Sequence, residues 1–408
     1  MGTLSTNEIS ITFFALFLLL LSSFLGGKLF EKIKAPKVVG EIVGGMIIGG
    51  SCIGLLFPEF FNLVFKNFVE EEKVLNIFYQ LGLVFLMFSS GFNTNISINK
   101  DNALNYGLLF FGATIIPMVL GIPFIFLFEN QFIGSANNEL AFCFVFLICA
   151  AITSIPVISK IFFDIGMMNT KFSNMVLTVS TLQDLCLWVL LNLSISLVET
   201  GKFEVKTFII TTILTIGLLF LTKLLEQILK KKEIQLNHNI LSISFLVILL
   251  VVYLLSLVNV NLMYSSFIAG YIMKVLIPKD NKEIEKIKDF SMNFFVPIYF
   301  ALVGIQLDII NNFSLLRFLM FFIIAFGLEF IGTVGTMWFT KLKKKTVFGL
   351  GITMNARGGP GIVLATTAYA YNIINLEFFT VIILTTMLSS TIAGYWLRVN
   401  RDEVKDEG

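Results

Sequence analysis

The stretch Thr178-Val-Ser-Thr-Leu-Gln-Asp-Leu-Cys-Leu-Trp-Val-Leu-Leu191 places a carboxylate near the middle of a long apolar segment. The segment runs from about residue 172 to residue 198. At about 1.5 Å per residue it is long enough to cross a bilayer as a helix. An ionisable side chain at that depth is costly, so it normally faces a wet cavity or a partner. Asp184, with the amide of Gln183 beside it, is therefore our candidate ion- and proton-binding site; the alternative is a structural carboxylate that pairs with a neighbouring helix.

The composition is that of a polytopic membrane protein. The chain has 408 residues, of which 56% are hydrophobic and only 14% charged, and its mean hydropathy is +0.88. These values lie outside the usual range of soluble domains. The net charge of +2 gives no indication of nucleic-acid binding. The four cysteines lie in apolar runs without metal-ligand spacing, which indicates neither a metal site nor a disulfide framework.

We predict an all-α protein with about thirteen transmembrane helices. The first apolar run lacks a basic leader and an obvious cleavage site, so we expect it to be a retained helix. The predicted spans are residues 9–26, 38–57, 74–91, 105–128, 140–163, 171–198, 206–229, 240–258, 261–277, 290–307, 314–340, 346–371 and 376–397.

The distribution of Lys and Arg supports this number of spans. Between the predicted helices, 23 of these residues fall in one set of alternate loops and in the C-terminal tail, and 4 fall in the opposite set. Cytoplasmic loops carry the excess of basic residues. We therefore expect an integral protein of the plasma (inner) membrane, with its N-terminus outside and its C-terminus in the cytoplasm.

Two predicted spans are interrupted near their centres. The fifth contains Ala151-Ile-Thr-Ser-Ile-Pro-Val157, and the twelfth contains Met354-Asn-Ala-Arg-Gly-Gly-Pro-Gly361. Proline and clustered glycine break helices, and such backbone is tolerated at membrane depth only when it is buried in protein or lines a cavity. The half-helix ends carry partial charges that need compensation. We expect Arg357 and Asn355 to supply it at one break, and Thr153 and Ser154 to supply hydroxyl groups at the other.

The interruptions occupy corresponding places in two five-helix blocks. Each is in the fourth helix of its block, spans 2–6 and spans 9–13, and an offset of seven helices gives the blocks opposite orientations. Inverted repeats with paired broken helices indicate the binding site of a secondary transporter. A midplane carboxylate can hold a proton or a monovalent cation but not both, so a site exposed alternately to each side gives antiport.

Five stretches in order along nearly the whole chain are similar to signatures of one family: Pro36-Lys-Val-Val-Gly-Glu-Ile-Val-Gly-Gly-Met-Ile-Ile-Gly49, Leu81-Gly-Leu-Val-Phe-Leu-Met-Phe88, Thr153-Ser-Ile-Pro156, Gln183-Asp184 and Met354-Asn-Ala-Arg-Gly358. They resemble the monovalent cation:proton antiporter-2 family, a sodium/hydrogen exchanger-like membrane domain of the Kef type. The pair Gln183-Asp184 has the form seen in its potassium-efflux branch.

The resemblance implies an inverted-repeat antiporter fold of the NhaA/NapA type with crossed discontinuous helices, a homodimer, and elevator-like movement of a core. The implied domains are interface helices at 1–104 and 240–313, core helices at 105–198 and 314–397, a linker helix and cytoplasmic loop at 199–239, and a short cytoplasmic tail at 398–408.

Several residues depart from the family pattern. Glu329, in Leu328-Glu-Phe-Ile-Gly332, stands where the family usually has a lysine. It could pair with Arg357 or act as a second ion-binding carboxylate. A snorkelling or lipid-facing structural role is a third, less favoured alternative. Asn93 and Gly361 stand where acidic residues are common in relatives. Because neutral Gln183 precedes a single aspartate, we lean toward electroneutral one-for-one exchange.

Two further titratable residues are weighed separately. Glu41 is acidic and lies within a span, and we favour a structural helix contact over ion binding for it. His238 lies in a basic loop, and we favour a solvated histidine over a pH sensor.

The sequence favours Na⁺ or K⁺ exchange for protons and leaves two rivals. One is a sodium-coupled symporter of a small organic anion, and the other is a channel or sensor without coupled transport. We find no hydrolytic or redox constellation, so we expect neither an enzyme nor a cofactor, and no nucleic-acid partner.

Overall fold

The computed structural model is helical, and its description covers most of the chain. The described residues are 5–33, 35–66, 69–93, 103–168, 170–201, 213, 217, 240–257, 260, 262–277, 282–307, 309–310 and 312–405. They form two compact units, each built from two separate stretches of chain. Unit 1 comprises Met1–Asn93 and Ile216–Ile310, and unit 2 comprises Thr94–Thr215 and Asn311–Gly408.

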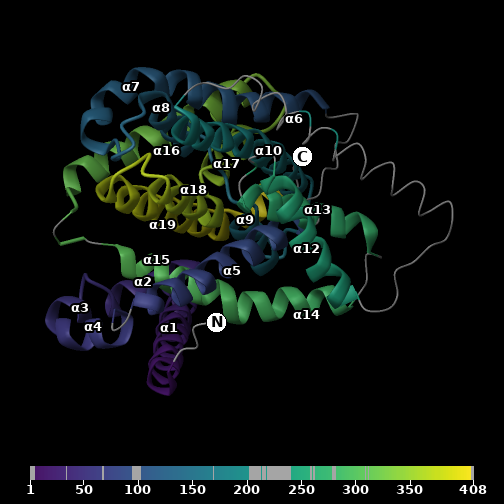
Figure 1. Ribbon diagram of the computed structural model, residues 1–408. Coiled ribbons are helices and arrows are strands. Elements are labelled where there is room, and N and C mark those ends of the chain that lie inside the picture. The colour runs from purple at the N-terminus through teal and green to yellow at the C-terminus, as the bar shows by residue number, and fades with distance from the viewer. Residues whose placement is uncertain are drawn as a thin grey trace. The chain divides into compact units, whose positions relative to one another are not determined.

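Unit 1 contains the helices of the first and third quarters of the chain (Figure 1). In order they are α1 (Thr6–Lys32), α2 (Lys37–Ile48), α3 (Ile53–Leu56), α4 (Pro58–Phe65), α5 (Val69–Asn93), α12 (Ile240–Ser256), α13 (Leu262–Leu276), α14 (Lys282–Phe290), the π-helical turn η3 (Ser291–Phe295) and α15 (Val296–Gln306).

Small residues let the helices of unit 1 pack very closely. A Cβ atom on Gly40 of α2 would lie 2.2 Å from the Gly26 carbonyl oxygen of α1, and one on Gly45 would lie 2.1 Å from the Ala301 carbonyl oxygen of α15. Lipid offers apolar side chains no hydrophobic gain on association, so close backbone packing of this kind is a main source of helix–helix attraction in membranes. Helix α2 is therefore held between α1 and α15.

Unit 2 contains the two predicted interruptions. Its elements are α6 (Ala103–Phe110), the π-helical turn η2 (Phe111–Ile115), α7 (Ile116–Phe132), α8 (Glu139–Ala150), α9 (Ile155–Asp164), α10 (Lys171–Thr200), α16 (Leu315–Met337), α17 (Lys344–Met354), α18 (Gly358–Ala370), α19 (Leu376–Val399) and α20 (Arg401–Lys405).

The core of unit 2 has an apolar cluster that draws on most of these helices. Leu109 of α6, Val176 of α10, Leu350 of α17 and Leu397 of α19 are fully buried in it. The short helix α20 contributes Val404, which is also fully buried. The segment after α19 is therefore packed into unit 2 up to this residue.

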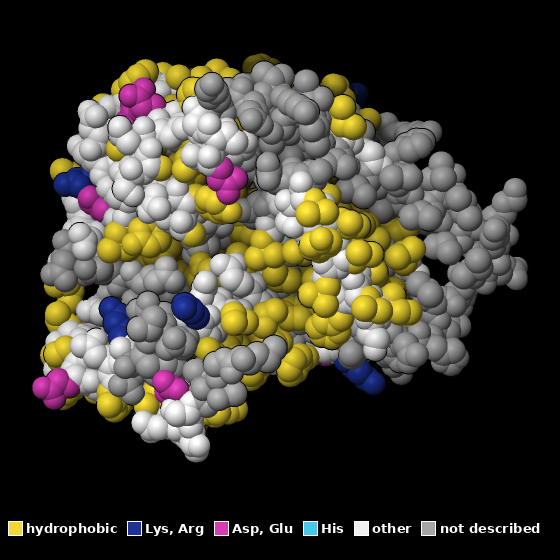
Figure 2. Space-filling model, viewed as in Figure 1, with side chains coloured by type: hydrophobic (Ala, Val, Ile, Leu, Met, Phe, Trp, Pro, Cys, Tyr) yellow, Lys and Arg dark blue, Asp and Glu magenta, His cyan; other side chains and the backbone are white. Residues whose placement is uncertain are grey.

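The helices agree well with the predicted spans. Seven described helices are long and apolar enough to cross a membrane: Thr6–Lys32, Lys37–Leu56, Lys73–Asn93, Ala103–Phe132, Lys171–Thr200, Leu315–Met337 and Leu376–Val399. Shorter helices cover most of the remaining predicted spans, except 206–229, which lies outside the described residues apart from 213 and 217. Figure 2 shows broad apolar patches and few charged side chains on the viewed face. The protein is an integral membrane protein, while the total of thirteen crossings and the inverted repeat stay predictions.

Candidate ion and proton site

Both predicted breaks are present in unit 2. Helix α8 ends at Ala150 and α9 begins at Ile155, so residues 151–154 are not helical. Pro156 is the second residue of α9, a position where the missing N–H of proline costs no helical hydrogen bond. Helix α17 ends at Met354 and α18 begins at Gly358, whose φ of 39° is in the left-handed region that favours glycine.

The two breaks lie against each other. The Ser154 N–H donates to the Ala356 carbonyl oxygen at 2.6 Å, and the Thr153 hydroxyl oxygen lies 2.6 Å from the Met354 carbonyl oxygen. A Cβ atom on Gly358 would lie 2.4 Å from the Ser154 Oγ atom. Groups of the first break therefore donate hydrogen bonds to backbone carbonyls at the second, which would otherwise be unsatisfied in a membrane.

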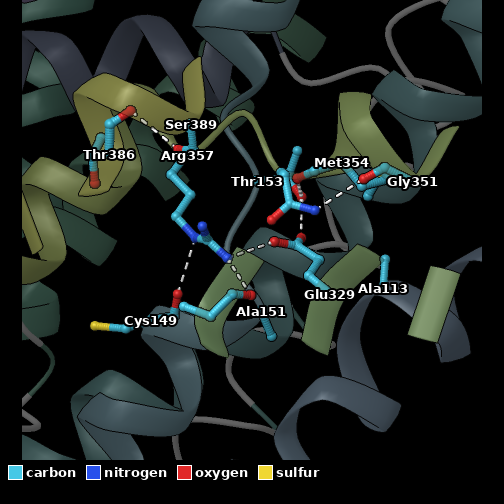
Figure 3. A network of polar contacts seen from close by, with 12 residues as sticks. Ala113, Cys149, Ala151, Thr153, Glu329, Gly351, Met354, Arg357, Thr386 and Ser389 are labelled. Atoms are coloured by element: carbon cyan, nitrogen blue, oxygen red, sulfur yellow. Dashed lines mark hydrogen bonds and ion pairs between the residues drawn. The ribbon is translucent and has the colours of Figure 1, made fainter. Parts of the chain in front are cut away.

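Arg357 lies in the second break and reaches the helix before the first. Its Nε atom donates to the Cys149 carbonyl at 3.1 Å, in the last turn of α8 (Figure 3). Its Nη2 atom donates to the Ala325 carbonyl of α16 at 2.9 Å. The end of α8 carries a partial negative charge, so a guanidinium is favourable there. Arg357 is only 1% exposed and its guanidinium lies at the end of α8, at the first break, whereas the sequence led us to expect it to compensate its own break between α17 and α18.

Glu329 of α16 lies between Arg357 and the first break. Its Oε2 atom is 3.0 Å from Arg357 Nη2, and its Oε1 atom is 3.1 Å from Thr153 Oγ1 (Figure 3). Its side chain is fully buried, so the expectation of a lipid-facing or snorkelling role is wrong. The expected contact with Arg357 is observed, while cation binding by Glu329 stays a prediction.

Gln183 of α10 links the first break to the π-helical turn η2 through hydrogen bonds. Its Nε2 atom donates to the Ala113 carbonyl at 3.0 Å and also to the Ala151 carbonyl. Ala113 lies in η2, and Pro117, four residues later, has no N–H to give it. Ala151 lies in the break. The Gln183 amide thus donates to one carbonyl in η2 and to one in the first break, and its Oε1 atom has no hydrogen-bond partner among the described residues.

Asp184 is fully buried on α10, and neither of its carboxylate oxygens has a hydrogen-bond partner among the described residues. The Oγ atom of Ser180, one helical turn earlier, is buried and likewise unpartnered within the described part of the chain. Residues four apart share a helix face. This face of α10 therefore presents oxygen atoms that no described protein group satisfies.

The structure brings most of the predicted site residues together. Thr153, Glu329 and Arg357 form one hydrogen-bonded network, and Ser154 and Gln183 contact the same breaks. Asp184 follows Gln183 in the chain, but no described hydrogen bond joins it to the network.

Three further predicted residues take different places. Asn355 donates through Nδ2 to the Gly351 carbonyl at 2.9 Å, so it caps the end of α17. A Cβ atom on Gly361 would lie 2.7 Å from Thr386 Oγ1, so α19 packs closely against this position. His238 lies outside the described residues.

Two predicted residues lie in unit 1. Glu41 is 3% exposed, and its Oε1 atom lies 3.4 Å from Lys37 Nζ one turn earlier on α2. Asn93 accepts a hydrogen bond from Lys288 at 2.7 Å. Both observations are compatible with structural roles.

Sequence reasoning missed several members of the site. Ser180 was detectable, because it lies one helical turn before Asp184. Ser390, which accepts a hydrogen bond from the Gly358 N–H at 3.0 Å, gave no signal in a helix rich in hydroxyl residues. The carbonyls of Ala113 and Cys149 were not predictable, because only tertiary packing brings them to the side chains from which they accept hydrogen bonds.

Comparison with known proteins gives consistent matches over most of the chain. The family model described as the sodium/hydrogen exchanger transmembrane domain matches residues 17–399. The Na⁺/H⁺ antiporter NhaS4 of Synechocystis is 26% identical over 381 residues, which cover 90% of this chain and 92% of that protein. The Na⁺/H⁺-K⁺ antiporter GerN of Bacillus cereus is 24% identical and covers 94% and 95%.

Among solved structures, the sodium proton antiporter MjNhaP1 of Methanocaldococcus jannaschii has a similar fold. Its TM-score is 0.68 at 17% sequence identity, with 97% of this chain and 99% of that chain covered. The chain also matches plant cation/H⁺ antiporters and spans less than half of their length.

Proposed function

The chain belongs to the sodium/hydrogen exchanger family, and from that premise we propose that it exchanges Na⁺ or K⁺ for protons across a membrane. The observation that carries the proposal is the buried Asp184 carboxylate, both of whose oxygens are unsatisfied among the described residues. A carboxylate in such surroundings needs either a proton or a cation. Since it cannot hold both, the two compete.

Neutral oxygens are available in the same unit to complete a cation shell. The unpartnered, buried Ser180 Oγ and Gln183 Oε1 atoms lie on the same helix as Asp184, and Asn355 Oδ1 is unpartnered at the second break, all judged among the described residues. Carboxylate, hydroxyl and amide oxygens suit hard cations. Thr153 and Ser154 add hydroxyl groups at the first break.

The division of the chain supports a moving core. Unit 2 contains both broken helices and Asp184, and unit 1 contains the glycine-packed helices α1, α2 and α15. We propose that unit 1 forms the interface of a homodimer and that unit 2 moves in the manner of an elevator to expose Asp184 to each side in turn. The same proposal places the protein in the plasma membrane with its N-terminus outside.

The two rival functions make different demands. A symporter of an organic anion needs positive groups free to meet the anion. The Nε and Nη2 atoms of Arg357 already donate to two carbonyls and to Glu329. Only its Nη1 atom has no partner among the described residues, so Arg357 offers an organic anion one nitrogen and not a bidentate contact. A channel or sensor would not link cation movement to proton movement.

The test is proton flux into or out of proteoliposomes, reported by a pH-sensitive dye after addition of Na⁺ or K⁺. Proton flux that starts on addition of a cation supports exchange and identifies the ion. Protein that is folded and gives no proton flux with either cation would contradict it, and cation leak without protons would favour a channel.

A further inference from the structure

The Thr153 hydroxyl contacts two oxygen atoms with a single proton to donate. Its Oγ1 atom lies 2.6 Å from the Met354 carbonyl oxygen and 3.1 Å from Glu329 Oε1 (Figure 3). A carbonyl oxygen can only accept, so the shorter contact uses the Thr153 proton. A hydroxyl oxygen can also accept, and an ionised carboxylate has no proton to give. A hydroxyl can share its proton between two acceptors. Beside the 2.6 Å contact, however, the contact with Oε1 is a full hydrogen bond only if Oε1 carries a proton.

We propose that Glu329 carries a proton on Oε1 in this conformation and is a second proton carrier of the exchange cycle, distinct from Asp184. The proposal rests on the proposed exchange function and assigns Glu329 its part in it. Glu329 then donates to Thr153 through Oε1 and accepts from Arg357 Nη2 through Oε2, at 3.0 Å. Every polar atom of its side chain has a partner of the right kind.

Arg357 does not require a charged Glu329 to remain stable as a cation. Its Nε atom donates to the Cys149 carbonyl at the negative end of α8, and its Nη2 atom donates to the Ala325 carbonyl. A protonated carboxyl group still accepts the remaining Nη2 hydrogen through its carbonyl oxygen.

Loss of the Glu329 proton changes which oxygen atom accepts the Thr153 hydroxyl hydrogen bond. When the Oε1–H bond breaks and its proton passes to water on the open side, Oε1 becomes an acceptor. The Thr153 hydroxyl then turns its proton to Oε1, and the Met354 carbonyl at the end of α17 loses that donor. A carbonyl oxygen beside the second break is thereby released, next in the chain to Asn355, whose Oδ1 atom is unpartnered among the described residues. Deprotonation of Glu329 therefore adds an oxygen ligand for a cation.

The charge balance of the cycle follows. If Asp184 exchanges one proton for the cation and Glu329 releases another, two protons cross for each monovalent cation, and one net charge moves. This differs from the one-for-one exchange that neutral Gln183 suggested in the sequence.

The decisive variant is Glu329→Gln, because the amide reproduces the protonated carboxyl group. Its NH₂ group can donate to Thr153 and its oxygen can accept from Arg357, but it cannot release a proton. The matched control is Glu41→Gln, which changes a buried carboxyl group of unit 1. In proteoliposomes on a solid-supported membrane, a rapid increase in Na⁺ or K⁺ concentration should give a transient current with wild type and with Glu41→Gln. Glu329→Gln should keep cation-triggered proton flux and lose the net current.

Wild type that exchanges protons without current, or Glu329→Gln that moves the same charge per cation as wild type, would overturn the proposal. No cation-triggered proton flux from wild type would instead overturn the exchange function itself. An infrared spectrum needs no transport and decides the protonation directly. We expect a carboxylic-acid C=O component at neutral pH that is absent from Glu329→Gln alone and present in Asp184→Asn and Glu41→Gln; its persistence in Glu329→Gln would refute a proton on Glu329.

Discussion

The guanidinium of Arg357 and the carboxyl group of Glu329 meet inside the protein, with Nη2 and Oε2 3.0 Å apart and both side chains buried. Arg357 belongs to the break between α17 and α18, and Glu329 belongs to α16. Through Cys149 and Thr153 the same two side chains also reach the break between α8 and α9. This contact therefore joins three parts of unit 2 around the two interruptions.

Arg357→Met should strongly destabilise the protein. It leaves the Cys149 and Ala325 carbonyls and the Glu329 carboxyl group without a donor in an apolar interior, and each buried acceptor left unsatisfied costs about 1–3 kcal/mol. The measurement is the midpoint of thermal unfolding in detergent. Arg317→Met is the matched control, because Arg317 pairs with Glu377 at a partly exposed site where such a pair contributes about 0–1 kcal/mol. Equal losses for the two variants would show that the Arg357 network is not structural.

Gly358→Ala should lower stability and transport together. Gly358 has a φ of 39°, and an added Cβ atom would lie 2.3 Å from Val157 Cγ2. Either the two breaks separate or the backbone shifts, at a cost of about 1–3 kcal/mol for the strained conformation alone. Gly335→Ala in α16 meets no atom within 4 Å and should be neutral or slightly stabilising. Thermal unfolding and proton flux of both variants test this, and a Gly358→Ala protein as stable as Gly335→Ala would disprove the packing of the breaks.

Gln183→Glu should loosen the backbone of the first break, residues 151–154. A carboxylate has no N–H to donate, so the Ala113 and Ala151 carbonyls both lose their donor, at about 1–3 kcal/mol for each buried group left unsatisfied. The expected result is a lower unfolding temperature and faster protease cleavage or hydrogen exchange at residues 151–154. Gln183→Met, which lacks both donor and charge, is the companion variant and should show the same exchange change; unchanged protection in both would mean that the amide does not hold the break.

Ser180→Ala should weaken cation binding with little effect on stability. The Ser180 Oγ atom has no hydrogen-bond partner among the described residues, so the fold loses nothing when it is removed. If this oxygen binds the cation, its loss costs about 1 kcal/mol, or about fivefold in affinity. The control is Thr181→Ala, whose hydroxyl donates to the Leu177 carbonyl at 2.9 Å and belongs to the helix. Equal cation affinities of Ser180→Ala and wild type would remove Ser180 from the site.

Local chemistry made the breaks predictable from sequence. Pro156 and Pro360 have no N–H to donate to the preceding helix, and in the structure each lies in the first turn of a new helix, directly after an interruption. The contact of Arg357 with Glu329 could be anticipated as one of the possible pairings, because few charged residues lie within the predicted spans.

The remaining features depend on tertiary packing. The π-helical turn at Phe111–Ile115 and the use of the Ala113 carbonyl by Gln183 require α10 to lie beside this turn, which no local pattern shows. The close packing of α19 against Gly361 and the burial of Val404 in the core of unit 2 also depend on tertiary packing. Hydropathy gives the positions of helices along the chain, but it does not show which faces meet.

The central claim is that a proton and a cation compete for Asp184. The most direct measurement is the affinity of detergent-solubilised protein for Na⁺ and K⁺ at a series of pH values, with release of protons on binding, in wild type and Asp184→Asn. Competition at Asp184 predicts that wild-type affinity falls by about tenfold or more for each unit by which the pH is lowered once the proton occupies the site, and that cation addition releases protons. Asp184→Asn should remain folded and show neither effect. If Asp184→Asn binds the cation with the affinity and pH dependence of wild type, Asp184 is not the shared site.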